Sequence, residues 1–256
     1  MKEVTYTILA LAAIYLFVAA FLYVYQRKMI YFPTSLDPHF NAEEVVIDNA
    51  GTHLRGWVLH PGKAHAVIYF GGNSELITHR EAYFNSQIPE HSVYLINYRG
   101  YGNSDGKPSE AALFADALAI YDAIRSQHAR VSAYGRSLGS GVAVYLAANR
   151  PLDRLILLTP YDSITEVAAR HYPLFPVRYL LQDRFDSASL AERIDIPVLV
   201  ASAELDRVIP LEHTLALRER LSRAQLSYVH VAGAAHNDIP EFEDYRAAVR
   251  RFMAEH

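Results

Sequence analysis

A serine in a strand-to-helix turn is the residue of this chain best suited to nucleophilic chemistry. Residues 135–139 read Gly-Arg-Ser-Leu-Gly, and they follow the apolar run 131–134 and open a helical pattern. Glycine is needed on both sides of such a serine, because the neighbouring backbone passes too close for a side chain. The pattern is that of a nucleophile elbow and predicts Ser137 as a nucleophile. The alternative is a Gly-Ser turn that caps a helix.

A serine hydroxyl needs a general base and an acid that orients the base, and both are found later in the chain. Asp206 follows the apolar run 198–202, and His236 follows the run 227–231. The order Ser, Asp, His, with the last two after consecutive late strands, is the order of an α/β-hydrolase. We therefore predict Ser137, Asp206 and His236 as a catalytic triad.

Three other carboxylates compete with Asp206 for the role of orienting acid. Glu204 and Asp238 are the nearest in sequence, and Asp162 follows the preceding predicted strand. Helix caps and surface charges are the default roles of such residues. The chain has 12 histidines, and most of the others fall in helices, early strands or loops, where a solvated or structural role is the default.

Eight short apolar runs alternate with helical patterns after Pro33, and they predict a mostly parallel eight-stranded sheet with helices on both faces. The predicted strands are 44–48, 54–59, 66–70, 93–97, 131–134, 155–159, 198–202 and 227–231. The predicted helices are 75–87, 109–127, 138–149, 211–222 and 239–254. In such sheets the ligand crevice lies beyond the carboxyl ends of the strands, which is where the predicted triad falls.

The first 28 residues predict an N-terminal membrane anchor. Between Glu3 and Gln26 lie 22 consecutive uncharged residues, and a helix of that length spans a bilayer core of about 30 Å. Tyrosines at both ends of the stretch fit aromatic belts. The alternatives are a cleaved signal peptide, which is shorter and has small residues at its cleavage site, and a buried core helix. Basic residues nearly balance on the two sides, so the sequence does not fix the side of the membrane.

Composition and charge restrict the remaining function classes. The chain has 256 residues, 51% hydrophobic and 20% charged, which suits one large domain, assigned here to residues 29–256. A formal net charge of −4 leaves no basic surplus for nucleic acid. The absence of cysteine excludes disulfides, thiolate catalysis and Cys-ligated metals. No metal or other cofactor is predicted, and no feature fixes the oligomeric state.

Several separated motifs together resemble the Bem46-like branch of the α/β-hydrolase-fold serine hydrolases, similar to the α/β-hydrolase domain-containing proteins 13 and 17. The resemblance runs from the anchor to the C-terminus. It is carried by Gln-Arg-Lys at 26–28, Tyr-Phe-Pro at 31–33, Tyr-Phe-Gly-Gly-Asn at 69–73, the Gly-rich segment 97–106, the pentapeptide 135–139, Asp206 and His-Asn-Asp at 236–238. In one departure, Gly71 stands where the family usually has the histidine of His-Gly-Asn, so any orienting hydrogen bond from that imidazole is lost.

Two backbone N–H groups are expected to form an oxyanion hole beside Ser137. The amide of Leu138, directly after the nucleophile and at a helix N-terminus, is one predicted donor. The resemblance places the second donor at Asn73, in the Gly-Gly-Asn loop.

A short cap is predicted at about residues 161–194, between two predicted strands. Its apolar side chains predict an acyl pocket formed by Tyr172, Phe175 and Tyr179, or else they only pack the insertion onto the domain.

These observations predict a membrane-anchored serine hydrolase that cleaves carboxylic esters or thioesters through an acyl-enzyme intermediate. The expected partners are a small-molecule or lipid-like acyl substrate, or an acylated protein, together with the membrane. The alternatives are a serine peptidase or amidase, because the same triad cleaves amides, and a non-catalytic membrane adaptor, which has no need of a complete triad.

Overall fold

Eight strands form one sheet in the part of the chain that the computed structural model describes, residues 1–35, 40 and 42–254. The strand order is β1-β2-β4-β3-β5-β6-β7-β8, with β2 antiparallel to both β1 and β4 and the later pairs parallel. The strands are β1 (Glu43–Asn49), β2 (Thr52–Leu59), β3 (His65–Phe70), β4 (His91–Ile96), β5 (Arg130–Arg136), β6 (Leu155–Leu158), β7 (Pro197–Ala203) and β8 (Gln225–Val231). The predicted fold class is confirmed.

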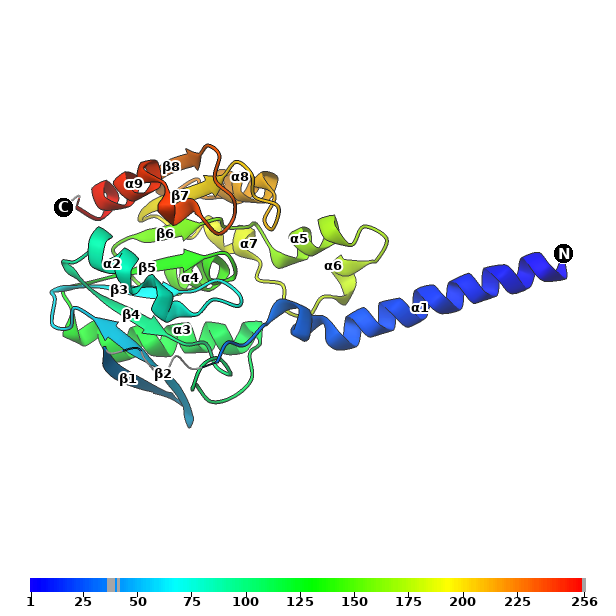
Figure 1. The fold of residues 1–256 in the computed structure, drawn as a ribbon, viewed down its shortest axis with the longest axis horizontal. Helices are drawn as coiled ribbons and strands as arrows, with labels where there is room; N and C mark the ends of the chain where they lie inside the picture. The colour runs from blue at the N-terminus through cyan, green and yellow to red at the C-terminus, as the bar shows by residue number, and fades with distance from the viewer. Residues whose placement is uncertain (36–39, 41, 255–256) are drawn as a thin grey trace.

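Helices cover both faces of the sheet (Figure 1). The described helices are α1 (Lys2–Ile30), α2 (Glu81–Gln87), α3 (Glu110–Ile124), α4 (Leu138–Asn149), α5 (Ile164–His171), α6 (Val177–Leu180), α7 (Ser187–Ala191), α8 (Leu211–Arg220) and α9 (Glu243–Ala254), with 3-10 turns η1 (Ile77–Arg80), η2 (Arg125–Gln127) and η3 (Ile239–Glu241). Side chains of α3, α4 and α8 pack into one apolar core, and side chains of α2 and α9 pack into the other.

The central strands are buried on both sides because each face of the sheet carries its own core. On β3, Ile68 and Phe70 belong to the core of α3 and α4, whereas Val67 and Tyr69 belong to the core of α2 and α9. Successive strand residues point to opposite faces, so burial on both faces requires an unbroken apolar run. The carboxyl ends of these parallel strands then form the edge that carries the site.

Three short helices fill the predicted cap region. α5 follows Ser163, whose side chain accepts a hydrogen bond from the Glu166 N–H, and α7 follows Asp186, which accepts one from the Ser189 N–H. The sequence does not predict these helices individually, because segments of eight, four and five residues produce no clear periodic signal. Figure 1 shows α5 and α6 projecting from the sheet toward α1.

The long helix α1 extends away from the sheet (Figure 1), and among the described helices it alone is long and apolar enough to cross a membrane. Its last turns contact the end of the cap. The Gln182 N–H donates to Gln26 Oε1 at 2.7 Å, and Arg27 Nε donates to Asp183 Oδ2 at 3.0 Å. Just after the helix, the buried Tyr31 O–H donates to the same carboxylate. Burial and the nearby carboxylate raise the pKa of Tyr31. The helix runs two residues past the predicted end of the anchor.

Candidate active site

Ser137 lies at a sharp turn between β5 and α4. Its backbone has φ of +50° and ψ of −118°, which is strained for a residue with a side chain. Close packing explains the two flanking glycines. A Cβ on Gly135 would lie 2.5 Å from the Gly139 carbonyl oxygen, and a Cβ on Gly139 would lie 2.1 Å from the Phe70 carbonyl oxygen. The turn therefore accepts only glycine at both positions, and it presents the serine at the carboxyl edge of the sheet.

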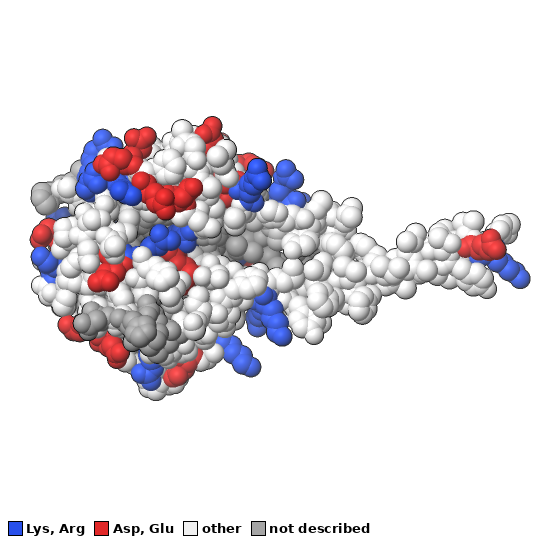
Figure 2. Space-filling view, in the orientation of Figure 1, with Lys and Arg blue, Asp and Glu red and all other residues white. Residues whose placement is uncertain are grey.

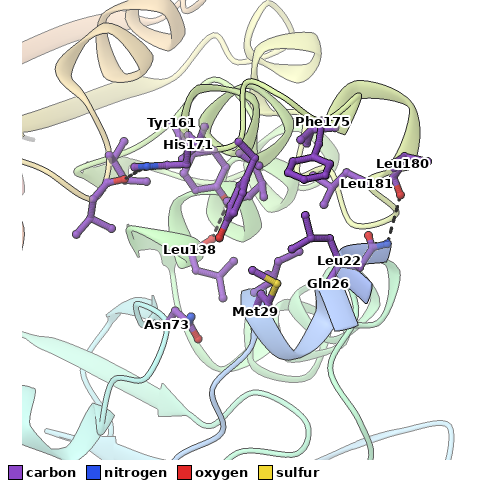
Figure 3. A pocket seen from close by; sticks show the side chains of 18 of the residues that line it. Leu22, Gln26, Met29, Asn73, Leu138, Tyr161, His171, Phe175, Leu180 and Leu181 are labelled. Atoms are coloured by element: carbon purple, nitrogen blue, oxygen red, sulfur yellow. Dashed lines mark hydrogen bonds between the residues drawn. The ribbon is translucent and has the colours of Figure 1, made fainter. Parts of the chain in front are cut away.

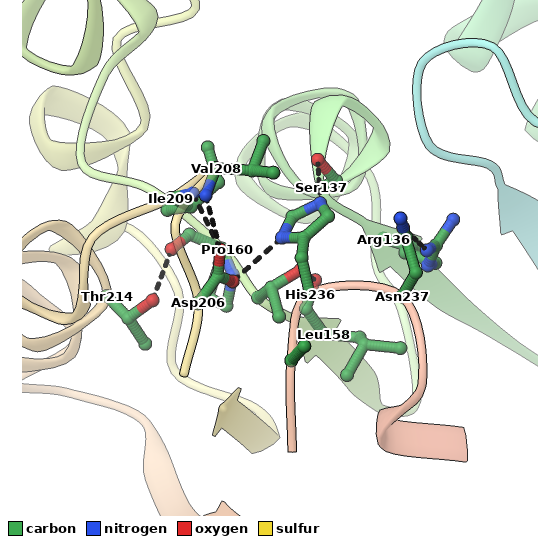
Figure 4. A network of polar contacts seen from close by, with 12 residues as sticks. Arg136, Ser137, Leu158, Pro160, Asp206, Val208, Ile209, Thr214, His236 and Asn237 are labelled. Carbon is green, nitrogen blue, oxygen red and sulfur yellow. Dashed lines mark hydrogen bonds and ion pairs between the residues drawn. The ribbon is translucent and has the colours of Figure 1, made fainter. Parts of the chain in front are cut away.

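Side chains from three separate loops meet at this turn (Figure 4). His236 Nε2 lies 2.9 Å from Ser137 Oγ, and His236 Nδ1 lies 2.7 Å from Asp206 Oδ2. Ser137 and His236 are each 8% exposed, and the Asp206 side chain is 3% exposed. A carboxylate at Nδ1 holds the imidazole proton there and leaves Nε2 as an acceptor. The arrangement can therefore remove the proton of the Ser137 hydroxyl.

Two backbone amides fix the carboxylate of Asp206. The N–H groups of Val208 and Ile209 both donate to Asp206 Oδ1 at 2.8 Å. Because that oxygen is occupied, the other carboxylate oxygen faces the histidine. The loop after β7 thus sets the direction of the imidazole ring.

The rival carboxylates have other partners. Glu204 and Asp238 each accept a hydrogen bond, at 2.7 Å, from a backbone amide in the loop before His236. Asp162 lies 2.9 Å from a different histidine, His213. All three therefore hold structure around the site rather than the ring of His236. Within the described residues, no group of three or more His, Asp or Glu side chains is arranged to hold a metal ion.

Both predicted oxyanion donors line the cavity that contains Ser137. Leu138 is the first residue of α4, where an amide has no acceptor inside its own helix. Asn73 lies in the loop after β3. The N–H group of the preceding Gly72 donates a hydrogen bond to the Glu75 carboxylate, at 2.5 Å. The Gly72 amide is therefore already paired, and Asn73 stays the predicted loop donor.

Tyrosines of the Gly-rich segment after β4 hold the oxyanion loop, a role that the sequence does not reveal. The Tyr98 O–H donates to the Gly71 carbonyl at 2.8 Å, and the Tyr101 O–H donates to Asn73 Oδ1 at 3.0 Å. The Phe32 N–H, just after α1, donates to the same Asn73 oxygen at 2.9 Å. Gly71, which replaces the histidine usual in the family, is thus fixed through its carbonyl instead of a side chain.

A buried ion-pair network also contacts the oxyanion loop and was not predicted. The Glu75 side chain, 5% exposed, lies 2.9 Å from Arg136 and also pairs with Arg80. Burial raises the pKa of Glu75, but the two guanidinium charges and the Gly72 N–H outweigh burial, so the pKa is lowered overall. Arg136 also donates to Asn237 Oδ1 at 2.6 Å (Figure 4). The network joins the oxyanion loop to the residues beside the triad serine and histidine.

Replacing Glu75 by Gln should destabilise the fold by about 3–5 kcal/mol, because two guanidinium groups lose their buried counter-charge. The change should also alter the acid dependence of stability. The folded chain lowers the pKa of Glu75. The carboxylate therefore contributes to the free energy of unfolding above the unfolded-state pKa of 4.5, and this contribution is lost as the pH falls through the folded-state pKa. Thermal unfolding of the full chain in detergent, from about pH 7 to about pH 3, measures both effects.

Glu90→Gln is the matched control for this change. Glu90 lies 3.0 Å from Lys63, but its side chain is 81% exposed, and exposed pairs contribute little. The control should unfold as the wild type does. Wild-type stability and wild-type acid sensitivity in Glu75→Gln would show that the network does not support the site.

An apolar cavity of about 460 Å³ opens onto Ser137. Figure 3 shows side chains that line this cavity. Cap residues form one wall, and the predicted Tyr172 and Phe175 are among them. The facing wall belongs to α1. Its lining residues are Ala19, Leu22, Tyr23, Gln26, Met29 and Ile30. The sequence does not reveal this wall, because in an apolar helix the residues that face lipid and the residues that face a cavity are of the same types.

The prediction for Tyr179 is corrected. Its side chain is 86% exposed and is not part of the cavity lining. On the single turn of α6, Val177 and Leu180 face the cavity, and residues three apart share one face of a helix. Tyr179 therefore points away from the cavity.

The mostly parallel sheet, the strained serine turn after β5 and the order of the serine, acid and histidine loops define a protein of the α/β-hydrolase class. Solved structures agree with this fold. The esterase Pf2001 of Pyrococcus furiosus gives a TM-score of 0.70 at 18% identity, with 88% of this chain and 98% of that chain covered. Est1E of Butyrivibrio proteoclasticus with bound ferulic acid gives 0.66 at 19% identity, with 82% and 97% covered.

Sequence relatives then identify the family. A scan of family models finds no match. Over 263 residues the chain is 37% identical to an uncharacterized protein, Rv2307c, of Mycobacterium tuberculosis, with 93% of this chain and 90% of that protein covered. Over 168 residues it is 34% identical to the α/β-hydrolase domain-containing protein 17B of Xenopus laevis, with 64% and 57% covered. The chain belongs to the Bem46-like family of α/β-hydrolases.

Proposed function

We propose that this hydrolase is a membrane-anchored serine enzyme that cleaves carboxylic esters or thioesters through an acyl-enzyme intermediate. One observation carries the proposal: the hydrogen bonds from Asp206 through His236 to Ser137 end at an apolar cavity. The name of the Pyrococcus furiosus neighbour, an esterase, supports the type of reaction. The long apolar helix α1 supports the anchor.

Acylation follows from the geometry of these three residues. Ser137 Oγ attacks the substrate carbonyl carbon while His236 Nε2 takes the hydroxyl proton, and Asp206 stabilises the imidazolium. The bond from the carbonyl carbon to the leaving oxygen or sulfur then breaks, and His236 gives the proton to the leaving group. Water then hydrolyses the acyl-enzyme. His236 takes a proton from the water, and the hydroxide adds to the acyl carbon. The bond to Ser137 Oγ breaks, His236 returns the proton to Ser137, and the carboxylic acid is released.

The negative charge that develops on the carbonyl oxygen needs donors that are in place beforehand. The N–H groups of Leu138 and Asn73 are the proposed donors, and one such donor typically lowers the barrier by about 3–4 kcal/mol. The N-terminal end of α4 adds favourable positive potential. The hydrogen bonds from Tyr98 and Tyr101 fix the loop of Asn73 before a substrate arrives.

The cavity lining favours an acyl chain over a peptide. Its described lining contains no Asp, Glu, Lys or Arg side chain, and an apolar wall is stabilised by covering methylene groups. A peptidase has to pair the backbone donors and acceptors of its substrate, and this wall supplies few partners. A non-catalytic adaptor gives no reason for a buried, fully hydrogen-bonded triad.

Catalytic efficiency on 4-nitrophenyl esters should rise from acetate through butyrate to hexanoate. Each methylene buried in the cavity contributes about 0.8 kcal/mol, so two more carbons should raise kcat/KM about tenfold until the cavity is full. Phe175→Asp places a charge in the cap wall and should flatten this rise. Assays of matching esters, thioesters and amides on the full chain in detergent measure both the acyl preference and the accepted leaving group.

Tyr179→Asp is the matched control, because it places the same charge on the same cap but outside the cavity. It should keep the wild-type dependence on chain length. If acetate is the best substrate and Phe175→Asp has no effect, the cap is packing alone. If the wild type turns over no ester or thioester, the proposed function is wrong.

A further inference from the structure

The tip of the cap, residues 172–177, lies beside the middle of α1. The rings of Phe175 and Tyr15 stack with centroids 5.2 Å apart and planes 6° apart. The Tyr15 O–H donates to the Leu174 carbonyl at 3.0 Å. Figure 1 shows the same arrangement, with the loop between α5 and α6 reaching along α1 away from the sheet. The cap tip therefore shares the surroundings of the helix.

The contact lies well inside the uncharged part of α1. Tyr15 is 12 residues from Glu3 and 12 residues from Arg27, the charged residues that flank this stretch. At 1.5 Å per residue, Tyr15 is about 18 Å from each. A hydrocarbon core is about 30 Å thick, so a bilayer crossed by α1 surrounds Tyr15 whichever flanking charge marks its boundary. The cap tip then lies in hydrocarbon as well.

The cap tip has the uncharged composition that hydrocarbon requires, and three of its four backbone N–H groups have partners within the cap. Its residues read Tyr-Pro-Leu-Phe-Pro-Val without a charge, and Leu174 is 80% exposed. In lipid, backbone donors need partners within the protein. The N–H groups of Tyr172, Phe175 and Val177 donate to cap carbonyls, and the two prolines have no N–H. Figure 2 shows an uncharged surface along this part of the molecule, with Lys and Arg side chains where the globular part begins.

The cavity connects this region with the nucleophile. Ala19 and Leu22 of α1 line it, and Ala19 precedes Arg27 by eight residues, which is about 12 Å toward the hydrocarbon. Ser137 and Leu138 line the same cavity. Figure 3 shows side chains of α1 and of the cap facing each other across this space. One continuous apolar surface therefore leads from the membrane region to the serine.

We propose that the substrate is a long-chain acyl ester that stays in the bilayer, and that its acyl chain enters the cavity sideways between α1 and the cap, beside the contact of Tyr15 with the cap tip. The inference rests on the proposed serine hydrolase function and names its substrate class, a membrane lipid ester. Moving an acyl chain through water costs free energy for every methylene that is exposed, and the lateral path avoids this cost. α1 is then a wall of the substrate site as well as an anchor.

Fluorescence quenching by brominated phosphatidylcholine tests the position of the cap tip. In vesicles of the full chain, the fluorescence added by Leu174→Trp should fall about twofold when bromine is present on the acyl chains. Leu226→Trp is the control, because Leu226 is 39% exposed near the start of β8, at the edge of the sheet opposite the site. Its fluorescence should not change. The native Trp57 contributes the same background fluorescence in both variants.

Two neighbouring alanines of α1 test the lateral path. Ala19 lines the cavity, whereas Ala20 is exposed and does not line it. The full chain in vesicles is labelled with dodecyl and ethyl fluorophosphonates, and the ratio of the two rates is measured. Ala19→Trp fills the acyl path and should lower the dodecyl-to-ethyl ratio about tenfold or more, whereas Ala20→Trp should stay within about twofold of the wild type.

The outcomes separate this inference from the function on which it rests. Quenching at position 174 no stronger than at position 226 would overturn the immersion of the cap tip. Equal ratios for Ala19→Trp and Ala20→Trp would overturn the lateral path. Neither result would contradict the proposed serine hydrolase chemistry. Failure of both probes to label the wild type would overturn the proposed hydrolase itself.

Discussion

Replacing Ser137 by Ala should lower ester hydrolysis about a million-fold and abolish labelling by a fluorophosphonate. In the proposed mechanism the Ser137 Oγ bonds the acyl carbon, and without this hydroxyl His236 has no proton to remove. The fold should survive, because the hydroxyl is bonded to His236 and makes no capping bond to α4. Alanine meets the same backbone strain at φ of +50°, so local strain does not change. Labelling and thermal unfolding on one preparation measure both expectations.

Ser140→Ala is the matched control for the nucleophile. Ser140 is also buried, and its hydroxyl donates to the Ser137 carbonyl at 2.6 Å. Its loss should lower stability by about 1 kcal/mol and leave labelling in place. Labelling of Ser137→Ala at the wild-type rate would remove Ser137 from the mechanism.

Replacing Asp206 by Asn should lower kcat about 10,000-fold, with a much smaller change in KM. The asparagine oxygen can keep the hydrogen bonds from Val208 and Ile209, which both reach Oδ1. Its NH₂ group then donates to His236 Nδ1, so the ring carries its proton on Nε2. A ring in that tautomer cannot accept the proton of Ser137. Steady-state kinetics with a saturating ester measure the loss.

Glu204→Gln and Asp238→Asn are the controls for the choice of acid. Each carboxylate holds a backbone amide of the histidine loop instead of the ring, so each change should lower kcat by about tenfold at most. A larger loss in Asp238→Asn than in Asp206→Asn would show that the wrong acid has been assigned.

Most of the sheet could be predicted because parallel strands buried on both faces appear as unbroken apolar runs. β3 and β7 are examples, and their observed bounds differ from the predicted ones by one residue at each end or less. The cap helices could not be predicted, because helices of four to eight residues are too short for a reliable periodic pattern. Their placement along α1 depends on tertiary contacts such as the one between Tyr15 and Leu174, which are 159 positions apart.

The three proposed triad residues could be selected from the sequence because they follow strands in a fixed order, but the residues that surround them could not. Glu75 is an unremarkable charge in the sequence, and only the fold brings it between Arg136 and Arg80. Tyr98 and Tyr101 belong to a Gly-rich segment whose role the sequence does not reveal, whereas in the fold their hydroxyl groups bond the oxyanion loop.

The contacts at the end of α1 mean that helix and catalytic part are not interchangeable modules. Asp183, whose side chain is 5% exposed, is held by Arg27 and Tyr31 at the end of this helix. A foreign membrane span of equal length would hold the protein at a bilayer, but it would remove the guanidinium from that carboxylate and change one wall of the cavity. Grafting the catalytic part onto another span should therefore transfer the reactivity of the serine without its selectivity.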